Sequence, residues 1–242
     1  MHPVDAAINA LRRGEVVLVY DADGREEETD MVVAGHAVTP DVVRTLRTDA
    51  GGLLCTAVGP DVHRTLGLPW ACDVLASAAA EFPGVEALLP RGDIRYDGSK
   101  PAFGLTVNHR DTFTGVTDED RSTTIRALAA AAAGLDATDA GAAREAFARD
   151  FRSPGHVQLL NGADRGLAAR QGHTELGLEL VRMAGLPPVA TVCEMLDPRS
   201  GRALSRADAE AHAARHGLVF LTGADVLRAF HGRVQTPAAV VA

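Results

Sequence analysis

The stretch VVLVYDADGREEETDMVVAG (residues 16–35) contains two apolar runs and an acidic segment between them. The runs at 16–20 and 30–35 are rich in valine and have the length of β-strands. Residues 21–30 carry six carboxylates and one arginine. The Asp-Gly pair at 23–24 favours a tight bend. The stretch therefore predicts two strands joined by an acidic turn, and it raises the question of what these crowded carboxylates hold.

The rest of the 242-residue chain continues this alternation of short apolar runs and helical patterns. Further strands, bounded by Gly, Pro or Asp, are predicted at 51–58, 102–108, 156–160, 189–196 and 218–223. Helices are predicted at 3–13, 40–48, 118–133, 139–150, 174–184, 205–216 and 223–230. Several have capping residues at the expected ends, namely Thr39, Thr117 and Ser205 at starts and Gly134, Gly185 and Gly217 at stops.

This order of elements predicts an α+β fold with one domain over residues 1–232. We expect a mixed β-sheet covered by helices, in the manner of an α/β/α sandwich. Residues 81–101 are expected to form a loop-rich insertion or flap, and residues 233–242 a flexible tail.

Composition excludes several classes of function. The net charge of −8, without a local basic patch, disfavours binding to nucleic acid or to an acidic membrane. No apolar run is long enough to cross a bilayer, and the N-terminus does not resemble a signal peptide. Three widely spaced cysteines without a CxxC pair argue against a disulfide framework and a structural zinc site. We therefore expect a cytoplasmic protein.

Two alternatives compete for the acidic segment. An EF-hand loop that starts at Asp21 fails, because glycine falls at position 4 instead of 6 and Val32 stands at position 12. A solvated acidic turn is the plain alternative. If the chain is extended here, however, Glu26, Glu28 and Asp30 share one face, and a divalent cation would make that arrangement favourable. The neighbouring Arg25 would then suit an anionic group of a substrate.

Four further stretches carry polar groups that suit a functional site. RQGHTELGLELVRMAG (170–185) opens a helix whose free N–H groups, with Arg170, His173 and Thr174, suit a phosphate; ordinary capping is the alternative. Glu194 lies inside the apolar run VATVCEMLD, where an idle carboxylate is costly. TFTGVTDEDR (112–121) and His156 in SPGHV are weaker signals, because a capping threonine and a structural histidine explain them equally well.

Six motifs together resemble one known family: DADGREEETDMVVAG, DAGGLLC, DTFTGVTDEDR, PGHV, RQGHTE and CEM. They follow the order found in the 3,4-dihydroxy-2-butanone 4-phosphate synthases of riboflavin biosynthesis and span nearly the whole chain. The resemblance implies a lyase that converts D-ribulose 5-phosphate to L-3,4-dihydroxybutan-2-one 4-phosphate and formate through a metal-stabilised enediolate. It implies Mg²⁺ as the cofactor, with Mn²⁺ as a substitute, and a homodimer with the active site near the interface.

By the same resemblance, Glu26 and His173 are the expected metal ligands, and His156 and Glu194 the catalytic residues. The expected substrate-binding residues are Arg25, Glu26, Asp30, Arg170, Gln171, Gly172, His173, Thr174 and Glu194. The sequence departs from the family pattern at Gly24 and Glu27. We expect the stand-alone form, without a fused GTP cyclohydrolase II domain. There are two rival hypotheses. One is another metal-dependent sugar-phosphate enzyme, such as an isomerase, which would release no formate. The other is a non-catalytic acidic metal-binding module, which would not need the phosphate-binding helix start.

Overall fold

A computed structural model describes residues 2–89, 96 and 100–235 of the chain. Its strands form one seven-stranded sheet in the order β4-β5-β3-β6-β2-β1-β7. The strands are β1 (Val17–Tyr20), β2 (Thr29–Ala34), β3 (Cys55–Val58), β4 (Phe103–His109), β5 (Phe151–Asn161), β6 (Val189–Glu194) and β7 (Val219–Thr222). The β3–β5 and β1–β7 pairs are parallel and the other pairs are antiparallel, so the predicted mixed sheet is confirmed.

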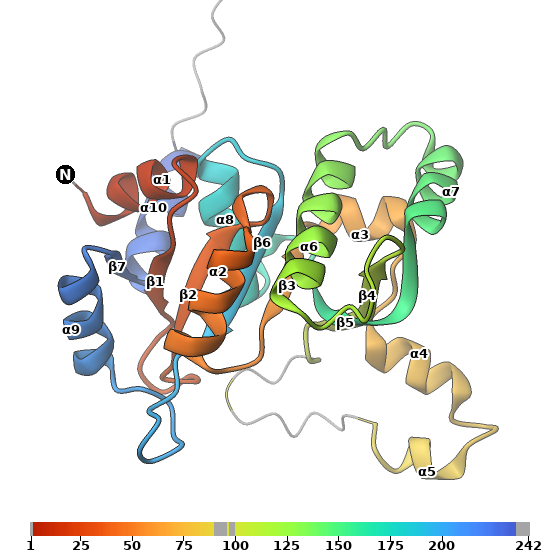
Figure 1. Ribbon diagram of the computed structural model, residues 1–242, viewed down its shortest axis with the longest axis horizontal. Coiled ribbons are helices and arrows are strands. Elements are labelled where there is room, and N and C mark those ends of the chain that lie inside the picture. Colours follow the sequence, from red (N-terminus) through yellow and green to blue (C-terminus); the bar gives the residue numbers. More distant parts are fainter. Residues whose placement is uncertain (1, 90–95, 97–99, 236–242) are drawn as a thin grey trace, which may run out of the picture.

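Helices cover both faces of this sheet (Figure 1). The α-helices are α1 (Pro3–Arg12), α2 (Pro40–Thr45), α3 (Pro60–Leu66), α4 (Ala71–Ala78), α5 (Pro83–Glu86), α6 (Asp118–Ala133), α7 (Ala140–Asp150), α8 (His173–Met183), α9 (Arg206–His216) and α10 (Gly223–Gln235). Three short turns of other helix types are η1 (Gly35–Ala37), the π-helical η2 (Leu46–Ala50) and η3 (Gly166–Ala168).

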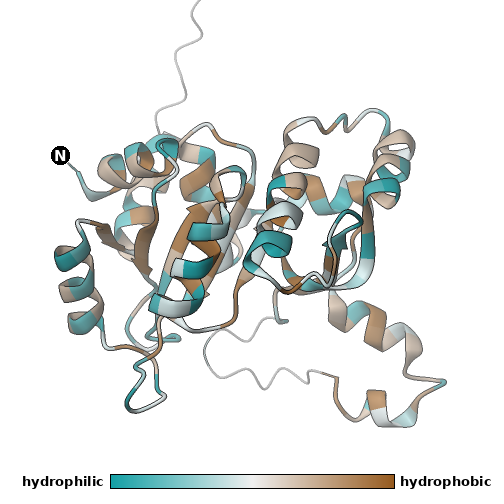
Figure 2. Cartoon of the chain, viewed as in Figure 1, coloured by the Kyte–Doolittle hydropathy of each residue, from teal (hydrophilic) through white to brown (hydrophobic). Residues whose placement is uncertain are grey.

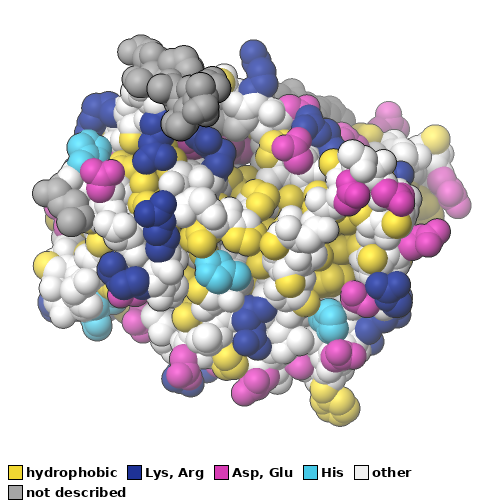
Figure 3. Space-filling model, turned by 90° about the horizontal axis from the view of Figure 1, so that it is seen from above, with side chains coloured by type: hydrophobic (Ala, Val, Ile, Leu, Met, Phe, Trp, Pro, Cys, Tyr) yellow, Lys and Arg dark blue, Asp and Glu magenta, His cyan; other side chains and the backbone are white. Residues whose placement is uncertain are grey.

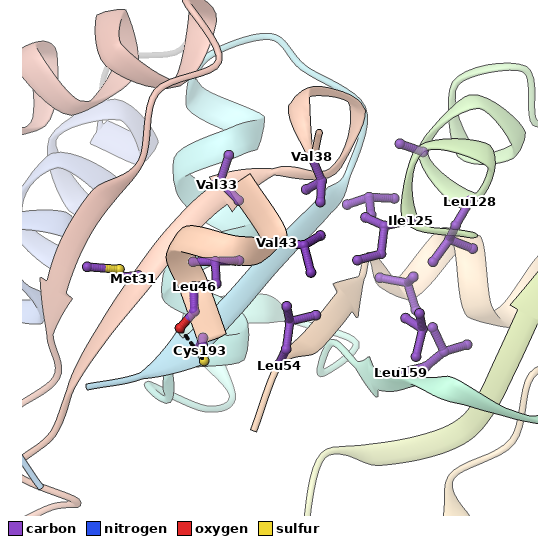
Figure 4. Close-up of a cluster of buried hydrophobic side chains, with 14 of the residues drawn as sticks. Met31, Val33, Val38, Val43, Leu46, Leu54, Ile125, Leu128, Leu159 and Cys193 are labelled. Carbon is purple, nitrogen blue, oxygen red and sulfur yellow. Dashed lines mark hydrogen bonds between the residues drawn. The ribbon is translucent and has the colours of Figure 1, made fainter. Parts of the chain in front are cut away.

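The two faces of the sheet build two hydrophobic cores because neighbouring strand residues point to opposite sides. Val17 and Val32 belong to the core formed with α1, α8 and α10. Leu18 and Met31 belong to the core formed with α2, α6 and α9, part of which is drawn in Figure 4. The central strands are accordingly hydrophobic, whereas the outer faces of α2 and α6 carry hydrophilic residues (Figure 2). The predicted α/β/α layering is therefore present.

Local capping signals placed several helix ends correctly. Thr39, Thr117 and Ser205 each accept a hydrogen bond from the backbone N–H three residues later. Gly185 and Gly217 adopt positive φ angles just beyond α8 and α9, a conformation that glycine reaches without steric cost.

Three short helices were not predicted. Within the segment expected to be a loop, α5 occupies Pro83–Glu86, and α4 precedes it; neither helix has a buried residue. Both project away from the sheet (Figure 1), and an element without a buried face leaves no apolar periodicity in the sequence. Helix α3 begins at Pro60, directly after its N-cap residue Gly59, and the pair Gly-Pro resembles a turn signal. At the other end of the chain α10 continues to Gln235, so residues 233–235 of the expected tail are helical and 236–242 lie outside the described residues.

The described surface carries charges of both signs. Lys and Arg side chains are interspersed with Asp and Glu on the face seen in Figure 3. Among the described residues, no helix combines the length and the apolar character that a bilayer crossing requires.

Candidate active site

Asp21, at the end of β1, organises the acidic turn. Its carboxylate accepts hydrogen bonds from the backbone N–H groups of Glu26 (3.0 Å) and Glu28 (3.1 Å), and from Arg25 Nη1 (3.0 Å). The chain reverses through this turn, with positive φ angles at Gly24 and at Glu27 (59°). The expected extended conformation is therefore wrong at Glu26: a turn, not strand alternation, brings this residue to the same cavity as its acidic neighbours.

A cavity of about 260 Å³ lies where this turn meets the start of α8 and the end of β6. Most of the predicted site residues line it. Its polar lining residues include Glu26, Glu28, Asp30, Arg170, His173, Thr174 and Glu194. An adjoining cavity of about 380 Å³ is lined by Arg25, Arg170 and Gln171, among others. The first cavity therefore combines carboxylates with an imidazole, and Arg170 lines both.

His173 lies close to two carboxylates of the site, those of Glu26 and Asp30. His173 Nδ1 lies 3.0 Å from Glu26 Oε2, and its Nε2 lies 3.6 Å from Asp30 Oδ1. His173 is 7% and Asp30 2% exposed, so water screens these groups poorly. The helix start and the acidic turn, which are 147 residues apart in sequence, thus meet in one cluster.

Burial and mutual charge shift the protonation of this cluster. Burial raises the pKa of Asp30 to about 8, although His173 opposes the shift. Burial lowers the pKa of His173, but Asp30, Glu26 and Asp21 outweigh that effect and raise it to about 9. Burial also opposes ionisation of Glu26, yet its hydrogen bond with His173 and the charge of Arg25 lower its pKa below the ordinary value. The apo site therefore holds protons that a cation would displace.

The donor set fits a divalent cation that prefers oxygen ligands. Within the described part of the chain, Asp30 Oδ1 and His173 Nε2 are buried without a hydrogen-bond partner. Asp21 also lies near, since its ligand atom and those of Glu26 and His173 are within 4.8 Å of one another. Both Asp21 oxygens already accept hydrogen bonds from backbone N–H groups.

The start of α8 gathers positive charge. Gly172 is the N-cap residue, so the predicted capping role of His173 and Thr174 side chains is not observed. A Cβ at Gly172 would lie 2.4 Å from Arg170 Nη1 and 2.6 Å from Arg25 Nη2. Two guanidinium groups thus converge on a helix N-terminus, where backbone N–H groups already favour an anion.

Glu194 lies opposite the acidic turn. It is the last residue of β6 and is the Cα partner of Asp30 on β2. Its Oε2 accepts a hydrogen bond from the Leu53 N–H at 2.7 Å. A Cβ at Gly52 would lie 2.4 Å from the same oxygen, so the glycine of the DAGGLLC motif leaves room for this carboxylate. The side chain is half-buried and lines the cavity.

His156 is the one predicted site residue that lies apart. It is exposed on β5, about 13 Å along the strand from the cavity residue Leu160. Its N–H donates to Asn108 Oδ1 at 2.7 Å, and Asn108 Nδ2 contacts both the His156 ring (3.2 Å) and the Thr114 carbonyl oxygen (3.4 Å). The motifs DTFTGVTDEDR and PGHV therefore form a second cluster, separate from the cavity within one chain.

Sequence reasoning missed three residues of the site. Asp21 appeared only as the first position of a rejected calcium loop, although it opens the acidic run. Cys55 is buried and lines the cavity, and burial raises its pKa. Tyr96 lines both cavities, and the Arg25 guanidinium lies 5.4 Å from its ring centre. Cys55 ends the DAGGLLC motif, but no role was predicted for it, and Tyr96 lies outside all six motifs.

A carboxylate–histidine cluster beside an arginine-lined helix start suits an enzyme that handles a phosphorylated substrate with a divalent cation. The family model for 3,4-dihydroxy-2-butanone 4-phosphate synthase matches residues 5–229. The chain is 47% identical over 227 residues to the synthase of that name from Methanothermobacter thermautotrophicus, with 94% of this chain and 95% of that protein covered. The synthase from Archaeoglobus fulgidus is 42% identical, with 92% of each chain covered.

A solved structure of a synthase from this family is also similar to the chain. The crystal structure of a 3,4-dihydroxy-2-butanone 4-phosphate synthase in complex with two magnesium ions has a TM-score of 0.72 and 28% identity, and covers 96% of this chain and 97% of that one. The chain belongs to the 3,4-dihydroxy-2-butanone 4-phosphate synthase family, as its motifs predicted. It is therefore an enzyme of riboflavin biosynthesis.

Proposed function

We propose that the chain converts D-ribulose 5-phosphate to L-3,4-dihydroxybutan-2-one 4-phosphate and formate. The observation that carries this proposal is the cavity itself. In it the Glu26–His173 pair (3.0 Å) faces further carboxylates, and Arg170 joins it to the positively charged start of α8. One end of the cavity thus suits a cation together with the hydroxyl and ketone groups of the sugar chain, and the other end suits a phosphate.

The run Arg170–Thr174 and Arg25 would bind the phosphate end of the substrate. Two guanidinium groups, a threonine hydroxyl and the first N–H groups of α8 supply charge-assisted hydrogen bonds to an oxyanion. Asp30 would bind the substrate's hydroxyl groups nearer the cluster. Binding at both ends fixes the sugar chain in one direction across the cavity.

Magnesium, with manganese as a substitute, would be held by Glu26 and His173. When bound, the ion supplies Lewis-acid polarisation of the substrate's ketone and hydroxyl oxygens. Glu28 also lines this cavity. Burial, with the charges of Glu26 and Glu194, raises the pKa of Glu28 above its ordinary value.

Proton transfer would fall to Glu194 and His156. The reaction removes the C3 proton to give an enediolate, expels the C1 hydroxyl as water, shifts the carbon skeleton and, by addition of water, releases C4 as formate. Each step moves a proton to or from carbon or oxygen, which is work for a carboxylate and an imidazole. Glu194 lies at the cavity wall, fixed by the Leu53 N–H.

Formate release tests the activity directly. The purified enzyme is incubated with D-ribulose 5-phosphate and Mg²⁺, and formate is measured with a coupled formate dehydrogenase. We expect stoichiometric formate, loss of turnover with chelator, and recovery with Mg²⁺ or Mn²⁺. An enzyme that consumes the substrate without formate would instead be an isomerase or aldolase, and full turnover after complete metal removal would contradict the metal-dependent mechanism.

The separation of His156 from the cavity supports a homodimer with shared active sites. The cluster around His156 carries exposed apolar side chains, with Phe113 92% and Val116 53% exposed. Exposed aromatic and aliphatic groups of this kind are typical of contact surfaces. In the dimer that we propose, His156 of one subunit reaches the cavity of the other. The cytoplasmic location stays a prediction.

Mixing two inactive variants tests this arrangement. Glu26→Ala and His156→Ala subunits are unfolded together and refolded in equal amounts. If each site takes Glu26 from one subunit and His156 from the other, random pairing restores about a quarter of the sites. If both residues act within one chain, no site is restored and the mixture stays inactive.

A further inference from the structure

Glu175, the last residue of the motif RQGHTE, is a buried carboxylate to which the sequence assigns no role. Its side chain is 0% exposed. Oε1 accepts a hydrogen bond from the Ala163 N–H at 3.1 Å, and Oε2 lies 3.0 Å from Arg170 Nη1. The carboxylate thus joins α8 to the loop after β5 and to the arginine that lines the cavity.

Burial of the Glu175 carboxylate costs desolvation free energy, which a functional role at this position would explain. A buried ion pair is often no more stable than apolar residues of similar volume in the same place. Leu176 and Leu178, which follow Glu175 in α8, bury apolar side chains. The charged pair is therefore a weak source of folding stability at this position, whereas its geometry fixes one end of the guanidinium of Arg170.

Glu179, one turn further along α8, provides the contrast. It is also largely buried, at 8% exposed, and it also pairs with an arginine, Arg182, through a 2.7 Å hydrogen bond. The Arg182 side chain is 60% exposed and does not line the cavity of the acidic cluster. Two glutamates of α8 therefore each pair with an arginine, and only the pair of Glu175 ends at the site.

We infer that Glu175 is a positioning residue, which holds the Arg170 guanidinium in the orientation that binds the substrate's phosphate. This inference rests on the proposed function, because it takes Arg170 as a phosphate ligand. Orientation matters at the crowded start of α8, because the guanidinium groups of Arg170 and Arg25 both lie close to Gly172.

The test compares Glu175→Gln with the matched control Glu179→Gln. Glutamine keeps the volume and can still accept from the Ala163 N–H, but its amide carries no charge to hold Arg170. We expect the KM for D-ribulose 5-phosphate to rise about tenfold in Glu175→Gln, with kcat within about threefold of the parent value. Glu179→Gln should keep both constants. Equal KM values in the parent and Glu175→Gln would overturn the inference.

A double variant separates this inference from the proposed phosphate site. If Glu175 acts through Arg170, adding Glu175→Gln to Arg170→Ala should raise KM no further. An additive rise would overturn the positioning role. A normal KM in Arg170→Ala alone would overturn the phosphate site instead. Should Glu175→Gln not fold, Glu175→Met, which fills the same space without a polar group, is measured by the same criteria.

Discussion

Replacing Gly172 by alanine should damage substrate binding far more than folding. The new Cβ would lie 2.4 Å from Arg170 Nη1 and 2.6 Å from Arg25 Nη2, so each guanidinium has to move by about 1 Å to restore van der Waals contact. A hydrogen bond to a charged group contributes about 1.5–3 kcal/mol. Loss of one such bond to the phosphate therefore weakens binding about 10- to 150-fold.

The backbone at Gly172 accepts a side chain without strain. Its φ of −89° and ψ of 171° are extended, a conformation that any residue adopts. Alanine is a poorer N-cap than glycine, which costs up to about 1 kcal/mol. For a chain of this length the melting temperature should fall by only about 2–4 °C.

Steady-state kinetics and thermal melts on the same sample check this prediction. Gly177→Ala is the matched control, because it makes the same substitution in α8 but its Cβ would meet only Ala190, Val32 and Val192 at 3.4–3.5 Å. We expect a KM near the parent value for this control. The reasoning is refuted if Gly172→Ala binds ribulose 5-phosphate as tightly as the parent, or if Gly177→Ala weakens binding equally.

Three further predictions concern the carboxylates and the imidazole. The raised pKa values of Asp30 (3.8 to about 8) and His173 (6.5 to about 9) mean that the folded apo protein holds these protons more tightly than the unfolded chain does. Its free energy of unfolding, followed by denaturant titration, should therefore fall as pH rises from each ordinary pKa to the raised value. The Mg²⁺ affinity measured by calorimetry should rise between about pH 7 and pH 9, because fewer protons have to be displaced. An affinity that stays constant over this range would contradict the prediction. Glu194→Gln should fold normally yet lose about 10²–10⁴-fold in kcat, and a melting-temperature loss with normal kcat would make Glu194 structural. Gly52→Ala, whose Cβ would lie 2.4 Å from Glu194 Oε2, should also lower kcat, while normal turnover would show that Glu194 tolerates displacement.

The elements that the sequence predicted well are those whose signals are local. Thr39, Thr117 and Ser205 mark helix starts because a capping side chain and the N–H groups that it satisfies lie within one turn. The valine-rich strands were recognised because both faces of the sheet are covered, which leaves continuous apolar runs. Helices α4 and α5 bury no residue, so nothing in their pattern distinguishes them from a loop.

The candidate site was predictable where one motif contains both the reactive group and its support. The acidic run 21–30 is not uniformly solvated: Asp21 and Asp30 are each 2% exposed, whereas Asp23 and Glu27 are exposed. That division follows from the turn between β1 and β2, which places the ends of the run inside and its tip outside.

The roles of residues that act through other side chains could not be assigned from the motifs. Glu175 stands in the same motif as Arg170, but the motif does not show that the two side chains pair or that the Ala163 N–H donates to the carboxylate. The exposure of His156 becomes informative only once the cavity is located elsewhere. Carboxylate and imidazole side chains are common in sequences, and what distinguishes the ones in this site is the set of neighbours that holds them after folding. The residues that position a reactive group are therefore harder to find from a sequence than the reactive group itself, because their signal is a tertiary contact rather than a motif.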